Sequence, residues 1–422
     1  MNVAIDEANT TSRNVTHLYV TEHWVGKLER GKTRWPHEER RAALRRVLGA
    51  ATDAEVGLYS MRLTDAGYDP EWDDGDIDRR TVLRAGVLGA AQVHAALTVV
   101  DLAHLVAAVQ DAHRYLDHDI VGHLRERLGA CTAADGTHGP NSSLPVMLGL
   151  LGVVERHAME VKPGVRSELL AVGARGAEFT GWLYRDLGQP ALAAYWRHRA
   201  ASWSSAIGDE TMRAYVLLKN SQAAWDRRDA ADMLELIRQV HEGPWRLPSR
   251  VRAEALQQEA RGQAMASGRK TVVEDKLGEA RALLLQQAVV EQADHTGLAE
   301  HYDQALLGVQ TAMCYRENGQ IERARALYER WLSPKVFSRR DYGYFLALKA
   351  ETIAVDGDPD AAAEAGTTAL AIAAATDSIR SLGELRRLAG RLAPRSSRPA
   401  VAAYLHAFGA ELDLRRLRQP VG

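Results

Sequence analysis

Cysteine is scarce in this chain: among its 422 residues there are only two, Cys131 and Cys314. They lie far apart and match neither a metal-ligand nor a redox spacing, so the sequence predicts no disulfide framework and no cysteine-based metal site. We expect both to be buried as small apolar residues in a protein of the reducing cytoplasm.

Long apolar runs are also lacking. The uncharged run from Ala85 to Val100 follows Arg79 and Arg80, as in a twin-arginine export signal. However, it lies far from the N-terminus and is shorter than the ~20 residues that span a bilayer. The sequence therefore predicts an internal buried helix here and no membrane partner.

Neither sign of charge is in large excess, because the formal net charge at pH 7 is only −2. Locally, Lys and Arg outnumber the acids between Arg13 and Arg46, and acids dominate from Asp53 to Asp78. A basic cluster of this kind is typical of a phosphate-binding face, and an ordinary solvated surface is the alternative interpretation.

Runs of alternating strand pattern are missing from Thr81 onward. Apolar residues recur there at spacings of three and four, interrupted by Gly, Pro and Asp, which predicts helices almost throughout and an all-α fold. The expected parts are a short head (1–59), an acidic linker (60–80), a helical bundle segment (81–166) and a repeat domain (167–422). The breaker Gly243–Pro248 is expected to separate two helix pairs of the repeat domain.

Small and aromatic residues repeat at fixed offsets in the helical part. Tyr184, Gly188, Ala193 and Ala200 stand at offsets 0, 4, 9 and 16; Tyr315, Gly319, Ala324 and Tyr328 stand at 0, 4, 9 and 13; Gly357 and Ala362 keep the step of five. Small residues at such positions let two antiparallel helices cross closely. The pattern resembles tetratricopeptide repeats, which implies an α-solenoid of about five helix pairs from Ser167 onward. An irregular all-helical domain is the alternative.

The head contains a match to the phosphate-loop pattern G-x-x-x-x-G-K-[ST], with Gly26, Gly31, Lys32 and Thr33 at the fixed positions. Such a loop needs a strand before it, converging backbone amides and a helix that starts at the lysine. Here the variable positions are good helix formers, and Pro36 interrupts the segment that follows. We interpret the match as chance and expect no nucleotide cofactor.

Two helices are expected in the head instead. The first runs from Glu22 to Arg30 and is closed by a left-handed C-cap at Gly31. The second runs from His37 to Leu48. The residues expected to face inward on this second helix are Ala42, Leu44, Val47 and Leu48.

A family resemblance appears in residues 20–31, V-T-E-H-W-V-G-K-L-E-R-G. This stretch resembles the third helix of lambda-repressor-like (XRE-type) helix-turn-helix regulators. Together with the repeats, the whole chain resembles actinobacterial regulators that fuse such a head to a C-terminal tetratricopeptide sensor domain. The resemblance implies a cytoplasmic transcription regulator, expected to be a homodimer, that binds double-stranded DNA and senses a peptide, small molecule or protein partner.

The DNA-binding residues that the resemblance implies lie in and just after the first helix. Thr21, Glu22, His23 and Lys27 would face base edges, and Arg30, Lys32 and Arg34 would hold phosphates. The family places two helices ahead of this one, whereas only one short helix fits before Thr21, so the helix-turn-helix is expected to be N-terminally shortened. The alternative is a scaffold or protein-interaction protein whose shortened head no longer binds DNA.

The tetratricopeptide likeness also implies a ligand or partner groove on the first helix of each pair. Its expected residues are Trp182, Arg185, Lys219, Gln222, Met313, Arg316 and Glu351. Trp182, Arg185 and Lys219 are expected to hold a carboxylate or an acidic peptide terminus. Ordinary exposed or inter-helix positions are the alternative.

A histidine cluster raises the possibility of a metal site, with His94, His104, His113, His118 and His123 within one short stretch. The closest of them are five residues apart, whereas a helical ligand pair needs a spacing of four, so no metal is expected. No nucleophile elbow or carboxylate dyad stands out either, and we expect a protein that is not an enzyme and has no cofactor.

Overall fold

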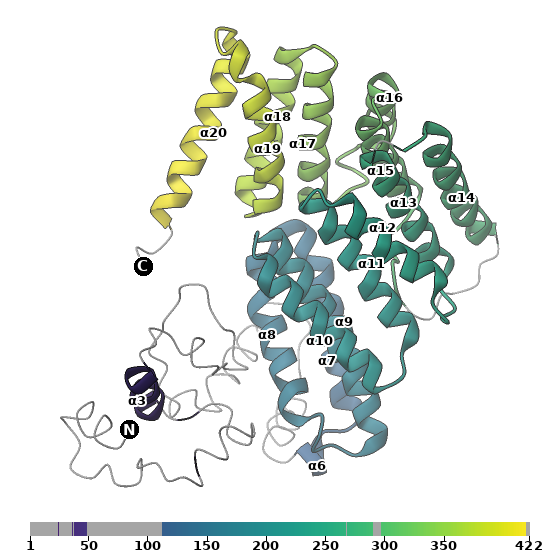
Figure 1. Cartoon of the computed structure of the whole chain (residues 1–422), viewed down its shortest axis with the longest axis vertical. Helices are drawn as coiled ribbons and strands as arrows, with labels where there is room; N and C mark the ends of the chain where they lie inside the picture. The colour runs from purple at the N-terminus through teal and green to yellow at the C-terminus, as the bar shows by residue number, and fades with distance from the viewer. Residues whose placement is uncertain are drawn as a thin grey trace. The chain divides into compact units, whose positions relative to one another are not determined.

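The computed structural model describes residues 24, 36, 38–48, 112–266, 268–289 and 297–418. The chain divides into two units, Met1–Asp76 with Pro420–Gly422, and Ile77–Gln419. All regular structure in the described residues is helical, and no strand occurs among them (Figure 1). The all-α fold class predicted from the sequence is therefore confirmed.

In the first unit the described helix is α3 (Glu38–Leu48). It confirms the helix predicted from His37 to Leu48, but its predicted inward face is partly wrong. Ala43 is the buried residue, at 1% exposure, while Val47 is 54% exposed. Apolar residues occur on more than one side of this short helix, so their spacing alone did not define the buried side.

The second unit is built from helices α6 to α20. Their bounds are α6 Ala112–Tyr115, α7 His118–His138, α8 Pro140–His157, α9 Pro163–Asp186, α10 Pro190–Ala206, α11 Glu210–Asp226, α12 Ala230–Glu242, α13 Ser249–Met265, α14 Lys270–Val289, α15 Gln304–Glu317, α16 Ile321–Trp331, α17 Arg339–Val355, α18 Pro359–Ala375, α19 Ile379–Leu392 and α20 Pro399–Arg418, with a 3₁₀ helix η3 at Ala393–Arg395. The breaker at 243–248 lies between α12 and α13, as predicted.

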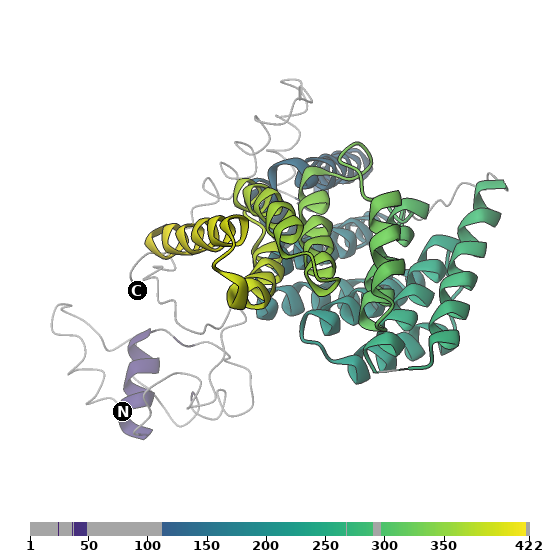
Figure 2. The same cartoon turned by 90° about the horizontal axis from the view of Figure 1, so that it is seen from above.

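Consecutive helices pack as pairs, such as α9 with α10, α13 with α14 and α17 with α18. The view from above shows the array ending at α20, which lies beside α18 and α19 (Figure 2). Within the described residues, α9 to α20 form six pairs, where the repeat pattern predicted about five.

The repeated small residues lie where the two helices of a pair turn and cross. Gly188, Gly319 and Gly357 have φ values of 68°, 72° and 97°, a left-handed conformation that glycine adopts without strain. On the second helix of the pair, Ala193 and Ala324 are 1% and 0% exposed. The glycines therefore occupy the turn within a pair, and the buried alanines occupy the contact between its two helices, where the sequence predicted close crossing for both.

The array also brings early and late helices together. The ends of α7 and α9 contact the starts of α17 and α19 (Figure 1). The approach is close, because a Cβ placed on Gly136 would lie 2.5 Å from the Cβ of Ser338. In the second unit, helices that are distant in the sequence are therefore in contact, in addition to neighbouring pairs.

The cysteines and the membrane-spanning potential of the helices were both considered from the sequence. Cys131 and Cys314 are both free and buried, as predicted. Among the described helices, none combines the length and the apolar content needed to cross a bilayer. The apolar run 85–100 lies outside the described residues.

Candidate functional site

The first helices of successive pairs, α11, α13, α15 and α17, form one layer that we call the inner layer. Buried ion pairs join neighbouring helices of this layer. Lys219 on α11 donates to Glu254 on α13, with 2.8 Å between Nζ and Oε1. Arg316 on α15 donates to Glu351 on α17 at 2.5 Å. The partners in both pairs are 35 residues apart, so each pair bonds one helix pair to the next along the array.

The residues predicted to line a groove belong to this network. Trp182 and Arg185 lie on α9, Lys219 and Gln222 on α11, and Met313 and Arg316 on α15. Met313 is 1% exposed and Gln222 is 9% exposed. The structure brings these residues onto one layer of helices, and most of their polar atoms are already bonded within the protein.

The carboxylates that accept hydrogen bonds from Arg185 and Gln222 lie on the first helix of the next pair. Arg185 donates from Nη2 to Asp226 Oδ1 at 2.9 Å, and Gln222 donates to Glu254 at 2.5 Å. Sequence analysis expected an external carboxylate for Arg185 and Lys219 and did not include Asp226 or Glu254. The sequence does contain a signal for these ion pairs: a basic residue on one helix pair is followed, about 35 residues later, by an acidic residue on the next pair.

Lys219 lies close to Glu254, Tyr215 and Glu178. Although burial alone would lower the pKa of Lys219, the Glu254 carboxylate raises it above its ordinary value. Burial raises the pKa of Tyr215 to about 12. Burial raises the pKa of the Glu178 carboxyl as well, in spite of Lys219 and Arg175.

A second polar cluster joins the early and late helices around Trp182. The Arg340 guanidinium on α17 forms a buried ion pair with Asp135 on α7, and Trp182 donates from Nε1 to Asp135 Oδ2 at 3.2 Å. The guanidinium of Arg380 lies 4.5 Å from the Trp182 ring centre and 3.7 Å from that of Tyr344. These cation–π contacts fix Trp182 between helices, which favours a structural role for its ring.

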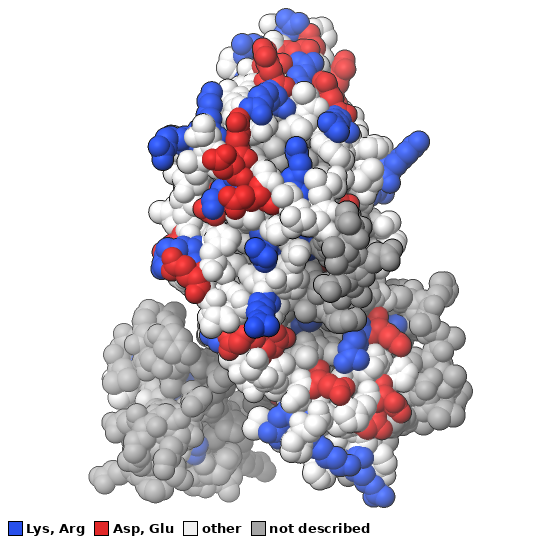
Figure 3. Space-filling model, turned by 90° about the vertical axis from the view of Figure 1, so that its right-hand side faces the viewer, with Lys and Arg blue, Asp and Glu red and all other residues white. Residues whose placement is uncertain are grey.

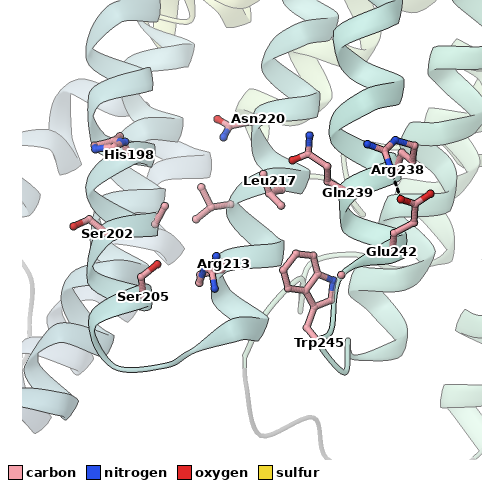
Figure 4. Close-up of a pocket in the computed structure, with 13 residues that line it drawn as sticks. His198, Ser202, Ser205, Arg213, Leu217, Asn220, Arg238, Gln239, Glu242 and Trp245 are labelled. Atoms are coloured by element: carbon pink, nitrogen blue, oxygen red, sulfur yellow. Dashed lines mark hydrogen bonds and ion pairs between the residues drawn. The ribbon is translucent and has the colours of Figure 1, made fainter.

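An open groove of about 720 Å³ lies on the outer side of α11, between α10 and α12 (Figure 4). It is lined by His198, Ser202 and Ser205 of α10 on one side, and Val216 and Leu217 are among its residues from α11. The groove could not be predicted from the sequence, because its residues come from three helices and share no motif.

Trp245 forms one end of the groove. Its indole Nε1 donates to the carbonyl oxygen of Val240 at 2.7 Å, which holds the ring in place. A Cβ on Gly243 would lie 2.0 Å from this ring, so only glycine fits beneath it. The breaker between α12 and α13 therefore also shapes the groove.

The residues predicted to bind DNA, Thr21, Glu22, His23, Lys27, Arg30, Lys32 and Arg34, lie outside the described residues. Two contacts link residues of the head that are described. The Arg40 guanidinium lies 5.0 Å from the ring centre of Trp24, and Arg41 donates to the carbonyl oxygen of Pro36 at 2.7 Å.

Of the clustered histidines, three fall in the described part. His118 contacts Glu168 at 3.0 Å, and His113 contacts the carbonyl oxygen of Glu160 at 3.0 Å. No group of three or more His, Cys, Asp or Glu in the described ranges is arranged to hold a metal ion. His94 and His104 lie outside those ranges.

Comparison with known proteins assigns no family to the chain: no family model matches it, and no curated protein matches it.

Proposed function

We propose that this chain is a cytoplasmic, non-enzymatic transcription regulator, whose basic head binds double-stranded DNA and whose helical array binds a ligand or partner. The observation that carries the proposal is the division into two units. One contains the signature 20–31 followed by the arginine-bearing helix α3, and the other contains the paired helices α9 to α20. Such a chain separates the reading of DNA from the sensing of a signal.

Charge supports the head as the DNA-binding part. On the face of the array shown in Figure 3, acidic and basic side chains of the described residues are interspersed, without a continuous basic patch. In contrast, Arg40, Arg41, Arg45 and Arg46 all lie on α3. Phosphate contacts supply most of the affinity of a DNA-binding protein, and they need clustered positive charge.

In this proposal the inner ion pairs set the geometry of the array. A ligand or partner that favours one arrangement of the helix pairs would alter how the two heads of a homodimer are spaced. Paired heads bind half-sites about one helical turn of DNA apart, so a change of spacing changes affinity.

The test is selection of bound duplexes from a random DNA pool by the whole chain. The Lys27→Ala/Arg30→Ala variant removes predicted contacts, and Lys335→Ala/Arg395→Ala, at two exposed positions of the array, is the matched control. The proposal expects the parent and the control to enrich the same motif and the head variant to lose it. Absence of enrichment by the parent would overturn DNA binding.

The alternative is a scaffold that binds a protein through the array and does not engage DNA. The groove between α10 and α12 favours it, because all its lining residues lie in the second unit. A partner captured by the array together with no duplex affinity would support the scaffold.

A further inference from the structure

The groove between α10 and α12 has the layout of a binding site for a linear ligand. The side chains His198, Ser202 and Ser205 lie on one face of α10, at spacings of four and three. They span about 10 Å, which is the length of roughly three residues of extended chain. The volume of about 720 Å³ lies within the range of known ligand sites.

The charges of the groove do not favour a phosphate-bearing ligand. Its two arginines are already neutralised by glutamates of their own helices. Arg213 donates to Glu210 at 2.8 and 2.7 Å. Arg238 donates to Glu235 at 2.9 and 2.7 Å and also bonds Glu242. Phosphate and nucleic acid need surplus positive charge, which this groove does not offer.

The free polar groups of the groove are short and uncharged or weakly basic. Among the described residues, His198, Ser202 and Ser205 have no side-chain hydrogen-bond partner within the protein, and each can act as both donor and acceptor. A peptide main chain presents alternating N–H and C=O groups, so it matches these side chains. The apolar side chains of Val216 and Leu217, with Trp245 at one end of the groove, provide room for an apolar side chain.

We propose that this groove binds a short, extended peptide segment that is uncharged over about three residues and places an apolar side chain over Val216 and Leu217, next to Trp245. The site lies on the outer side of α11, whereas Lys219 and Gln222 are bonded to Glu254 of the next helix pair. This inference rests on the proposed function, in which the array binds a ligand or partner, and it specifies the class of that ligand. The groove requires no residue of the head.

The test is selection of a random heptapeptide library displayed on phage by the whole chain, followed by affinity measurement with the selected peptides as synthetic probes. Ser202→Trp fills the groove from an exposed position of α10. Ala371→Trp makes the same addition at an exposed position of α18 and is the matched control. Thermal unfolding of both variants establishes that each is folded.

The proposal expects selected peptides to share an apolar residue flanked by uncharged ones, to bind the parent and Ala371→Trp equally, and to lose at least tenfold in affinity for Ser202→Trp. Equal binding to all three proteins would place the peptide elsewhere and overturn the proposal, as would failure to select any peptide. A peptide that becomes helical on binding would contradict the proposal that the bound peptide is extended. The selection of DNA duplexes tests the head independently. Failure to select a peptide would therefore not change the conclusion about DNA binding.

Discussion

Arg340 and Asp135 form a buried ion pair although they are 205 residues apart in the sequence. Their side chains are 6% and 3% exposed. Arg340 Nε also lies 3.9 Å from Asp186 Oδ2, so one guanidinium connects the ends of α7 and α9 to the start of α17. Although burial alone would lower the pKa of Arg340, the carboxylates of Asp341, Asp135 and Asp186 raise it.

Removal of this guanidinium should destabilise the second unit strongly. We expect Arg340→Gln to lower the free energy of unfolding by about 3–5 kcal/mol, since it leaves Asp135 buried without its counterion. Arg398→Gln is the control, because Arg398 pairs with Asp360 at the surface, where a pair contributes about 1 kcal/mol or less. Urea unfolding followed by circular dichroism measures both, and equal losses would contradict the assignment.

The Lys219–Glu254 pair should make the protein sensitive to acid. Although burial alone would raise the pKa of Glu254, Lys219 holds it below its ordinary value of 4.5. Since the folded-state pKa is the lower one, the stabilisation is present above pH 4.5 and is lost as the pH falls through the folded-state pKa. Unfolding free energies measured from pH 7 downward should therefore decrease below pH 4.5.

Glu254→Gln should flatten this acid-side decrease and should also lower stability at pH 7, because Lys219 then has no bonded carboxylate. Glu322→Gln, at an exposed position of α16, is the control and should keep the parent's slope. If the free energy of unfolding of Glu254→Gln fell with decreasing pH as steeply as that of the parent, other groups would be the cause of the acid sensitivity.

Substitution by alanine should change the stability in opposite directions at Gly129, within α7, and at Gly139, its C-cap. Gly139 has φ 81°, and a Cβ there would lie 2.1 Å from the carbonyl oxygen of Thr376, so Gly139→Ala should destabilise by more than about 1 kcal/mol. A Cβ on Gly129 meets nothing within 4 Å, and Gly129→Ala should stabilise by about 0.5–1 kcal/mol. Thermal unfolding midpoints that shift in the same direction would contradict this prediction.

The two thiols should be unreactive in the folded protein. Cys131 and Cys314 are 4% and 0% exposed, and burial raises the pKa of each thiol, which disfavours the reactive thiolate. A chromogenic disulfide reagent should label them only after denaturant is added. Ser396→Cys, in an exposed turn, should react at once and serves as the positive control. Fast labelling of the native parent would contradict the burial.

Local sequence pattern was sufficient to predict the helical fold and the break at 243–248. Apolar spacing indicated the all-α fold, and the repeated small residues indicated paired helices, although Gly188, Gly319 and Gly357 prove to lie in left-handed turns. These features depend on residues close in sequence. The exposed position of Val47 shows the limit, because several sides of α3 carry apolar residues.

Features that join distant residues could not be predicted. Nothing near Asp135 in the sequence indicates Arg340 as its partner, since the contact arises from the path of the whole array. The groove of Figure 4 depends in the same way on how α10, α11 and α12 lie together. Sequence analysis named Arg185, Lys219 and Arg316, and also Glu351, which proves to be the partner of Arg316. The other two partners, Asp226 and Glu254, were not named.

The central claim is that the head binds DNA, and the most direct measurement is the salt dependence of binding to the duplex that the whole chain enriches. The four predicted Lys and Arg contacts, Lys27, Arg30, Lys32 and Arg34, predict a slope of about −3 to −4 in log affinity against log salt concentration. Lys27→Ala/Arg30→Ala should reduce that slope by about 2. A slope near zero, or affinity equal to that of the head variant, would contradict DNA recognition by the head and leave the scaffold as the function.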